Sequence, residues 1–284
     1  MANIKIVTDG SCDFPQEVID LVNPDIVRIN VAFGEESFIG GVEITEEEFY
    51  EKMKKSDELP KTSSPSPNRF IEIYEKEDYE EIIVFTLTSK LSGTYSNAVI
   101  AKNMYEEKNG SNKRIEIIDT ENGSIGVSLM LLKTQRMIEE GKSMDEILAE
   151  VDKMKKDIVF FGTLATLENA IKGGRVNPIA GKLINALNFK VIIKIDEGLV
   201  KPIDKARGES NSLKKLFEYV KKNVDVSDIE HKDIIIGHAN CPHRAERIKK
   251  FIEEHYSFEK IMVAPIGPIM GTFTAEGAIL VAVL

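Results

Sequence analysis

Short apolar runs alternate with helix-like stretches along the first half of the chain. Ile4–Val7, Ile82–Phe85 and Ile115–Ile118 are rich in β-branched residues and bounded by turn residues, which is typical of buried parallel strands. Pro67–Glu75 and Gly93–Glu106 lie between these runs and repeat apolar residues at helical spacing. The alternation predicts a three-layer α/β arrangement built on a parallel sheet.

Two further patterns belong to this half. The segment Ile26–Phe33 predicts one more strand, and a turn follows it at Gly34–Glu36. Thr45 precedes three consecutive glutamates. A hydroxyl followed by acidic residues is typical of a capped helix start, so we expect a helix to begin there.

The pattern changes near Asp157. Val191–Ile195 and Leu199–Ile203 flank turn residues and predict a β-hairpin, while Lys172–Arg175, with two glycines, predicts a helix end or tight turn. Further apolar runs that predict strands are Val159–Phe161, Ile234–Gly237, Lys260–Ala264 and Ile279–Val283. We therefore expect an N-terminal α/β domain over residues 1–157, packed against a C-terminal α/β or α+β domain over residues 158–284.

Composition narrows the class of protein. The chain has 284 residues, of which 42% are hydrophobic and 30% are charged, and its formal net charge is -10. An acidic balance argues against a nucleic-acid partner. No window approaches the roughly 18 apolar residues of a spanning helix, so no stable membrane insertion is expected. The N-terminus does not resemble a signal peptide and the two cysteines are far apart, so we expect a cytoplasmic protein.

Two loops rich in hydroxyl groups carry the clearest chemistry. Lys61–Pro67 and Thr88–Ser96 each stand immediately before a predicted helix. Ser, Thr and Gly at such a place offer hydroxyls and free N–H groups to an anion, and Gly93 would let a ligand approach the backbone. Neither loop contains the His, Cys or paired carboxylates that would activate a hydroxyl as a nucleophile. The pattern therefore favours holding an anion over cleaving a bond.

Both loops also have a purely structural interpretation. Ser92 can cap the helix that follows it, and Ser66 can cap the helix that begins at the next proline. The cap at Ser66 leaves the hydroxyls of Thr62–Ser64 unexplained. A stiff, extended row of hydroxyls suits the orientation of a small polar head group.

Other polar segments carry weaker signals. A turn in which Asp9 bonds backbone groups is favoured over a catalytic or metal-binding Asp9, and Asp13 is expected to help cap the next helix. Cys12 has no histidine nearby in sequence to activate it. His238–His243 holds three potential metal ligands but matches no standard zinc spacing, and Gly267–Thr274 lacks the lysine of a nucleotide-binding loop.

Five segments together resemble the signature segments of the DegV family, in the family's order and across nearly the whole chain. They are Thr8–Asp13, Thr62–Pro67, Leu91–Tyr95, Gly173–Val176 and Gly267–Thr272. The resemblance implies a two-domain α/β protein that binds a long-chain fatty acid, such as palmitate, in a buried tunnel near the domain interface. For some members it also implies a separate fatty-acid kinase, which phosphorylates the carboxylate before phospholipid synthesis.

The resemblance assigns roles to individual residues. It implies that the hydroxyls of Thr62 and Ser92 bind the carboxylate. Ser63, Gly93 and Thr94 are further candidates for ligand binding, the last two through their backbone. The hydroxyl pattern had already selected both of these loops for an anion.

Two arginines and one phenylalanine complete the comparison with the family. Arg175 and Arg207 resemble the arginines that kinase-dependent members expose near the tunnel mouth; an ordinary surface arginine is the alternative. The family's C-terminal loop usually places a His after its Gly-Thr pair, where this chain has Phe273. The missing imidazole removes one hydrogen bond, worth about 1–3 kcal/mol to a charged acceptor. Burial of a long acyl chain, at about 0.8 kcal/mol per CH₂, outweighs that loss.

Two functions from different classes follow. The first is a fatty-acid-binding protein without catalytic residues, metal or cofactor of its own. The second is a hydrolase or transferase that uses a loop hydroxyl as nucleophile on a small ester or phosphate. Such an enzyme needs an activating base. The four histidines of the chain all lie in its second half: His231, His238, His243 and His255.

Overall fold

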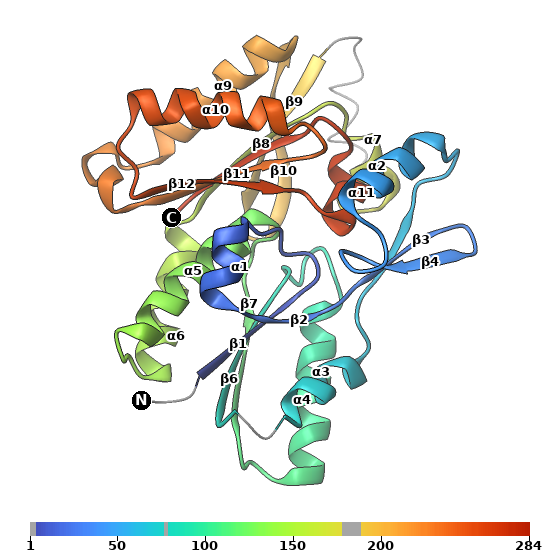
Figure 1. Cartoon of the computed structure of the whole chain (residues 1–284), viewed down its shortest axis with the longest axis vertical. Helices are drawn as coiled ribbons and strands as arrows, with labels where there is room; N and C mark the ends of the chain where they lie inside the picture. The colour runs from blue at the N-terminus through green and yellow to red at the C-terminus, as the bar shows by residue number, and fades with distance from the viewer. Residues whose placement is uncertain (1–3, 77–78, 178–188) are drawn as a thin grey trace.

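Two large β-sheets and a helix shared between them form the framework of the described part of the protein, and a third, small sheet adjoins them (Figure 1). The computed structural model describes residues 4–76, 79–177 and 189–284. A mixed α/β architecture was predicted, and it is confirmed. Within the described residues, no helix is both long and apolar enough to cross a membrane.

The first sheet is parallel and has four strands in the order β2-β1-β6-β7. Its strands are β1 (Ile4–Asp9), β2 (Asp25–Val27), β6 (Glu81–Thr86) and β7 (Arg114–Asp119). The three apolar runs at the start of the sequence analysis form β1, β6 and β7, so those predictions are confirmed. Because the strands are parallel, their carboxyl ends share one edge, and the loop after β6 lies there.

Helices cover both faces of this sheet, as alternate side chains of β6 show. Ile82 and Val84 pack with the helices α3 (Pro67–Tyr74) and α4 (Thr94–Asn109). Ile83 and Phe85 point to the other face and join the larger core. The helices on that face are α1 (Gln16–Val22), α5 (Ile125–Glu139) and α6 (Met144–Asp157). The sheet and the helices on its two faces therefore form the three layers that the sequence predicted.

The single strand predicted over Ile26–Phe33 is wrong. The chain leaves the parallel sheet after Val27 and enters a separate three-stranded antiparallel sheet, of order β4-β3-β5. Between the two sheets, the carbonyl of Arg28 accepts a bond from Arg69 and that of Ile29 accepts one from Gly40. These long-range bonds redirect the backbone. The small sheet consists of β3 (Asn30–Phe33), β4 (Glu36–Ile39) and β5 (Lys61–Ser63).

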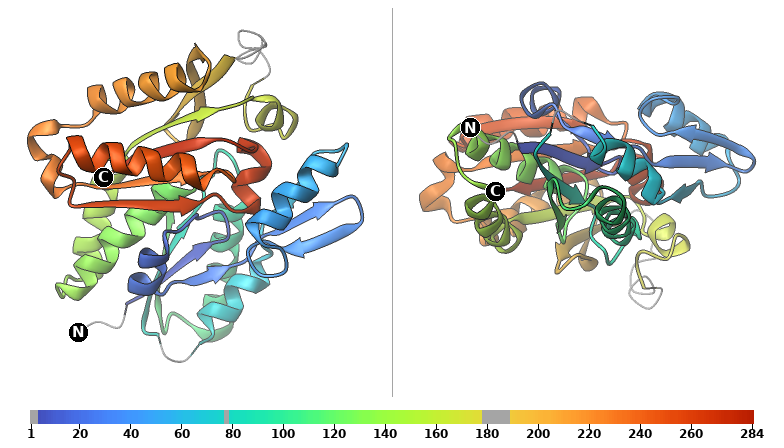
Figure 2. Two further views of the ribbon diagram at one scale, coloured as in Figure 1. Left: turned by 45° about the horizontal axis from the view of Figure 1, so that its top comes forward. Right: turned by 90° about the horizontal axis from the view of Figure 1, so that it is seen from below.

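The β3–β4 hairpin projects to one side of the molecule (Figure 2). The helix α2 (Glu46–Lys55) lies between β4 and β5 in the chain. Its start is the capped one predicted at Thr45, whose hydroxyl accepts from the N–H of Glu48 while the Glu48 carboxylate accepts from Thr45.

The other large sheet has six strands in the order β10-β9-β8-β13-β11-β12. Of its neighbouring pairs, β11 and β12 are parallel and the others are antiparallel. The predicted hairpin is β9 (Phe189–Asp196) and β10 (Leu199–Arg207). The other strands, all at predicted positions, are β8 (Val159–Leu164), β11 (Asp233–His238), β12 (Lys260–Pro265) and β13 (Ile279–Val283). Smaller elements of this half are α7 (Glu168–Lys172), the 3-10 helix η1 (Val226–His231) and α11 (Pro268–Thr274).

One face of the six-stranded sheet packs on two long helices, and the other packs on α5. Val281 and Val283 of β13 join the core under α9 (Glu209–Asn223) and α10 (Pro242–His255). Leu280 and Ala282, their neighbours in the strand, point to the opposite face and join the core around α5.

Helix α5 therefore contacts both sheets: β1 and β6 on one side, β11 and β13 on the other. Leu129, Met130, Leu131 and Leu132 are consecutive, and each is buried. A helix that is apolar all round is expected only where neighbours surround it. Strands of the parallel sheet all precede Asp157 and strands of the six-stranded sheet all follow it, while the division at residue 157 itself stays a prediction.

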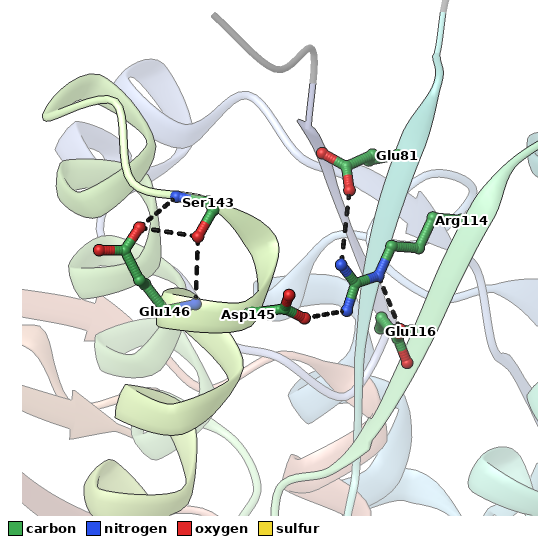
Figure 3. A network of polar contacts seen from close by, with 6 residues as sticks. All are labelled: Glu81, Arg114, Glu116, Ser143, Asp145 and Glu146. Carbon is green, nitrogen blue, oxygen red and sulfur yellow. Dashed lines mark hydrogen bonds and ion pairs between the residues drawn. The ribbon is translucent and has the colours of Figure 1, made fainter.

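Arg114 ties the edge of the parallel sheet to the start of α6 (Figure 3). Its guanidinium lies 2.9 Å from Glu116 on its own strand and 2.5 Å from Asp145 in the first turn of α6. The same turn begins with a reciprocal cap between Ser143 and Glu146. Acidic residues stabilise the N-terminus of a helix, so this network fixes where α6 begins.

Candidate functional site

A cavity of about 810 Å³, counted to its open mouth, lies between the hydroxyl-rich loops and the six-stranded sheet. Most of its wall is apolar and comes from β8, β9, β13 and α11. Representative residues of that wall are Phe160, Leu164, Ile193, Ile195, Met270 and Leu280.

A chain of three hydroxyl groups forms a polar part of the wall and the layer behind it. The Ser64 and Ser92 oxygens are 3.0 Å apart, and the Ser92 and Thr94 oxygens are 2.8 Å apart. Ser92 Oγ also accepts a bond of 3.3 Å from the backbone N–H of Thr94. Ser64 is exposed and Thr94 is buried, so the chain runs from the cavity mouth into the protein.

Neighbouring backbone bonds hold the two loops in place. The side-chain amide of Asn97, in the first turn of α4, donates to the carbonyl of Pro65 over 2.9 Å. After β6, the N–H of Thr88 donates to Asn122, and the Thr88 carbonyl accepts from the N–H groups of Leu91 and Ser92. The hydroxyls are therefore positioned before any ligand arrives, which lowers the cost of ordering them.

The predicted binding residues divide into two groups. Thr62, Ser63 and Ser92 line the cavity. Gly93 is the N-cap residue of α4, and Thr94 lies behind Ser92 and supports its hydroxyl. The capping interpretation of Ser92 is wrong: the N-cap residue of α4 is Gly93, and the helix has no side-chain cap. The Ser92 hydroxyl accepts instead from the N–H of Thr94, the first residue of the helix.

Ser64 is the residue of the Thr62–Ser64 row to which the sequence analysis assigned no binding role. It belongs to the same hydroxyl run as Thr62 and lines the cavity beside Ser92. The run of hydroxyls was the available signal. Its pairing with Ser92 depends on a contact between two loops, which no local pattern reveals.

Arg175 also lines the cavity, half-buried. Its Nε donates to the carbonyl of Leu91 over 3.2 Å, and its Nη1 donates to the carbonyl of Gly173 over 2.5 Å. The guanidinium carbon lies 4.8 Å from the centre of the Phe273 ring, within reach of a cation–π contact. Arg207, by contrast, is exposed at the end of β10. It is not one of the described residues that line the cavity.

Phe273 reaches this position because α7 and α11 lie close together. The side-chain amide of Asn169 in α7 donates to the carbonyl of Thr272 in α11 over 3.0 Å. Gly173 ends α7, and a Cβ atom at this residue would lie 2.6 Å from the Phe273 ring. Only glycine permits this approach without a shift of the ring.

Two buried carboxyl groups lie in the first loop, and neither faces the cavity. Asp9 accepts bonds from the backbone and hydroxyl of Ser11 and from the N–H of Leu87. The turn interpretation of Asp9 is therefore confirmed. Burial raises the pKa of its carboxyl, and the three bonds oppose that change.

The expected cap at Asp13 is wrong. Helix α1 begins after Pro15 without a side-chain cap, because Asp13 bonds elsewhere. Its carboxyl accepts from the N–H of Gly267 over 2.8 Å and from the hydroxyl of Ser124. Asp13 thus fixes the start of α11, which carries Met270 and Phe273 of the cavity wall. Burial raises the pKa of its carboxyl to about 7.

The cysteine and histidine candidates show structural contacts. Cys12 is buried, its thiol contacts the carbonyl of Ser124, and burial raises the thiol pKa well above its ordinary value. His238 Nδ1 accepts from the N–H of Cys241, and burial lowers the pKa of the imidazole. Across residues 4–76, 79–177 and 189–284, no three metal-ligating side chains gather into a site.

Comparison with known proteins identifies the family. The protein-family model described as "Uncharacterised protein, DegV family" matches residues 3–284 of this chain. The chain belongs to the DegV family. A DegV domain-containing protein of Staphylococcus aureus (strain COL) is 30% identical over 283 residues, which is 98% of each chain.

Solved DegV structures have the same fold. A DegV family protein of Ruminococcus gnavus, whose structure was refined with vaccenic acid, matches with a TM-score of 0.91 and 28% identity. The match covers 99% of this chain and 100% of that one. The DegV family protein of Thermus thermophilus, described for its fatty-acid binding, matches with a TM-score of 0.89, 25% identity and 99% coverage of both chains.

Proposed function

We propose that this DegV family protein binds one long-chain fatty acid, with the acyl chain in the cavity and the carboxylate at Thr62 and Ser92. One observation carries the proposal: an apolar cavity has a preorganised set of hydroxyls in its wall. The fatty acids associated with the relatives from R. gnavus and T. thermophilus support it.

The two parts of the cavity suit the two parts of such a ligand. Each buried CH₂ of an acyl chain contributes about 0.8 kcal/mol, so apolar contacts dominate affinity. Hydrogen bonds to the charged head group contribute about 1.5–3 kcal/mol each and fix its direction. The hydroxyls therefore select for an acid end, while the apolar wall supplies most of the binding free energy.

The alternative of a hydroxyl nucleophile gains no support from the surroundings of Ser92. The bonded partners of its hydroxyl are the hydroxyls of Ser64 and Thr94 and a backbone N–H. No histidine is among the described residues that line the cavity. A nucleophile of this kind needs a base within hydrogen-bond reach. We therefore propose a binding protein and not an enzyme.

The proposal extends to a fatty-acid kinase as partner. Ser63 and Ser64 are exposed at the cavity wall, so a second protein could reach a carboxylate bound there. Arg207 is exposed as well and is available for such a contact. Transfer of phosphate to palmitate, measured with a fatty-acid kinase in the presence and absence of this protein, tests this part separately.

Lipid extraction followed by mass spectrometry tests the binding proposal directly. Protein purified from a lipid-containing host should carry one long-chain fatty acid per chain. Delipidated protein should take up palmitate at the same ratio. Protein that carries no fatty acid and takes up none would refute the proposal.

A further inference from the structure

We propose that Arg175 pairs with the carboxylate of the bound ligand, and that Phe273 holds the guanidinium in position for this contact. The inference deepens the proposed function and rests on it. It gives the binding site a cation in addition to its hydroxyls. It also gives Arg175 a role inside the cavity, where the family resemblance implied a role toward a partner protein.

The charge of the cavity wall is the first observation. Arg175 is the one charged side chain among the described residues that line the cavity. The remaining wall consists of apolar side chains and hydroxyls. A carboxylate that enters an apolar site loses its hydration, and that loss is large unless a partner of opposite charge replaces it. Arg175 is therefore the wall residue suited to compensate the ligand's charge.

The position of Arg175 is the second observation. Its Nε–H donates to the carbonyl of Leu91, which belongs to the same peptide unit as the N–H of Ser92. The guanidinium is thus fixed beside the backbone of Ser92. Ser92 is in turn the centre of the hydroxyl chain from Ser64 to Thr94. A carboxylate held by the Ser92 hydroxyl would lie next to the arginine.

The unused donors of the guanidinium are the third observation. Arginine has five N–H donors, and two of them serve the carbonyls of Leu91 and Gly173. Within the described part of the chain, Arg175 forms no ion pair with a carboxylate. The charge is therefore not neutralised by the protein, and the remaining donors match the two oxygens of a carboxylate.

Phe273 explains how an arginine keeps this position. The aromatic ring lies 4.8 Å from the guanidinium carbon and presents a face on which the flat cation can stack. The ring has no donor or acceptor of its own, so it does not compete for the carboxylate. Gly173 contributes twice, through its carbonyl to Arg175 and through the space it leaves for the ring.

Palmitate and methyl palmitate distinguish this role from a packing role. Binding of both ligands is measured by titration calorimetry to the intact protein, Arg175→Gln and Arg175→Lys. We expect Arg175→Gln to weaken the affinity for palmitate by about tenfold or more and to change the affinity for the methyl ester by less than about twofold. Arg175→Lys should lie between, because an ammonium keeps the charge but cannot form the same fork. Equal losses for acid and ester, or no loss for the acid, would overturn the inference.

Phe273→Leu tests the positioning role. Leucine keeps an apolar side chain but removes the stacking face, so we expect a smaller loss that again affects the acid and spares the ester. Equal effects on the two ligands would contradict positioning by the ring. Arg247→Gln is the matched control, because Arg247 is exposed on α10, on the opposite face of the six-stranded sheet. It should bind both ligands like the intact protein.

A measurement on the intact protein avoids any folding defect of a variant. NMR titration of carboxyl-labelled palmitate should show the pKa of the bound carboxyl below that of the free acid, because a nearby cation favours the charged form. A raised pKa would overturn the inference. If the intact protein binds neither ligand, the proposed function fails and the inference fails with it. If it binds both while Arg175→Gln keeps its affinity for palmitate, the inference alone is overturned.

Discussion

The hydroxyl oxygens of Ser64 and Ser92 lie 3.0 Å apart although they belong to different loops. One loop leaves the small antiparallel sheet after β5, and the other leads from the parallel sheet into α4. The contact brings the two hydroxyl-rich segments of the sequence together in one wall. A ligand atom placed between them could accept from both side chains.

Removal of two hydroxyls should weaken the binding of an acid selectively. For Thr62→Ala combined with Ser92→Ala, we expect palmitate to lose about 1–3 kcal/mol of binding free energy, because the variant lacks donors to a charged acceptor. Methyl palmitate should lose less. Titration calorimetry with the two ligands measures the difference. Equal losses would show that these hydroxyls do not recognise the carboxylate.

Enlargement of Gly173 should disturb the cavity wall and the fold together. In Gly173→Ala the added Cβ would lie 2.6 Å from the Phe273 ring, which must move. We expect a loss of about 1–3 kcal/mol in the free energy of unfolding, measured with urea, and weaker binding of palmitate.

Gly174→Ala separates steric contact from backbone strain. Gly174 has a positive φ of 77°, and nothing lies within 4 Å of a Cβ built there. This variant should therefore lose stability through strain alone and bind palmitate normally. Equal binding defects in the two variants would argue against the contact between Gly173 and Phe273.

Asp13 should make the stability of the protein depend on pH. Burial raises the pKa of its carboxyl from 3.8 to about 7, with a smaller contribution in the same direction from Glu46. Between these values the folded protein keeps a proton that the unfolded chain releases. The contribution of Asp13 to the free energy of unfolding should therefore be largest below about pH 4 and decrease as the pH rises to about 7.

Asp13→Asn should remove this dependence. The amide oxygen preserves an acceptor for the N–H of Gly267. The free energy of unfolding of the variant should change less with pH over the same range, and the change should differ from that of the unaltered protein by at most roughly 3–5 kcal/mol. Urea unfolding at several pH values measures the slope. Asp20→Asn, at an exposed position of α1, is the control and should leave the slope unchanged. A slope that survives in Asp13→Asn would assign the titration to another group.

A larger side chain at Ala170 should change the length of the preferred acyl chain. Ala170 is buried in α7 and lines the cavity. Ala170→Leu would fill part of the space, and each displaced CH₂ of the ligand would cost about 0.8 kcal/mol. Mass spectrometry of the extracted lipid should therefore show shorter chains than in the unaltered protein. An unchanged distribution would place the acyl chain away from α7.

Elements defined by local pattern could be predicted from the sequence. The β-branched runs of β1, β6 and β7 are such elements, and so is the capped start of α2 at Thr45. The loops that contain Thr62 and Ser92 could be selected because hydroxyls before a helix have a chemical meaning of their own, while the choice of these two residues rested on the family resemblance. The signal in each case lies within a few neighbouring residues.

Features that depend on distant residues could not be predicted in the same way. The break between β2 and β3 is made by bonds from Gly40 and Arg69, which no local pattern predicts. Helix α5 lacks an apolar stripe because both sheets surround it, so its periodicity is weak. The stacking of Arg175 on Phe273 likewise joins α11 to the end of α7.

The position of α5 determines how the chain can be divided. A cut near residue 157 would leave this helix with the first half and would uncover the side of β13 that carries Leu280 and Ala282. The first half would in turn expose the apolar side of α5. Neither fragment would have a complete core. The two halves are therefore expected to unfold in a single cooperative transition, and the separated fragments to regain structure only when mixed.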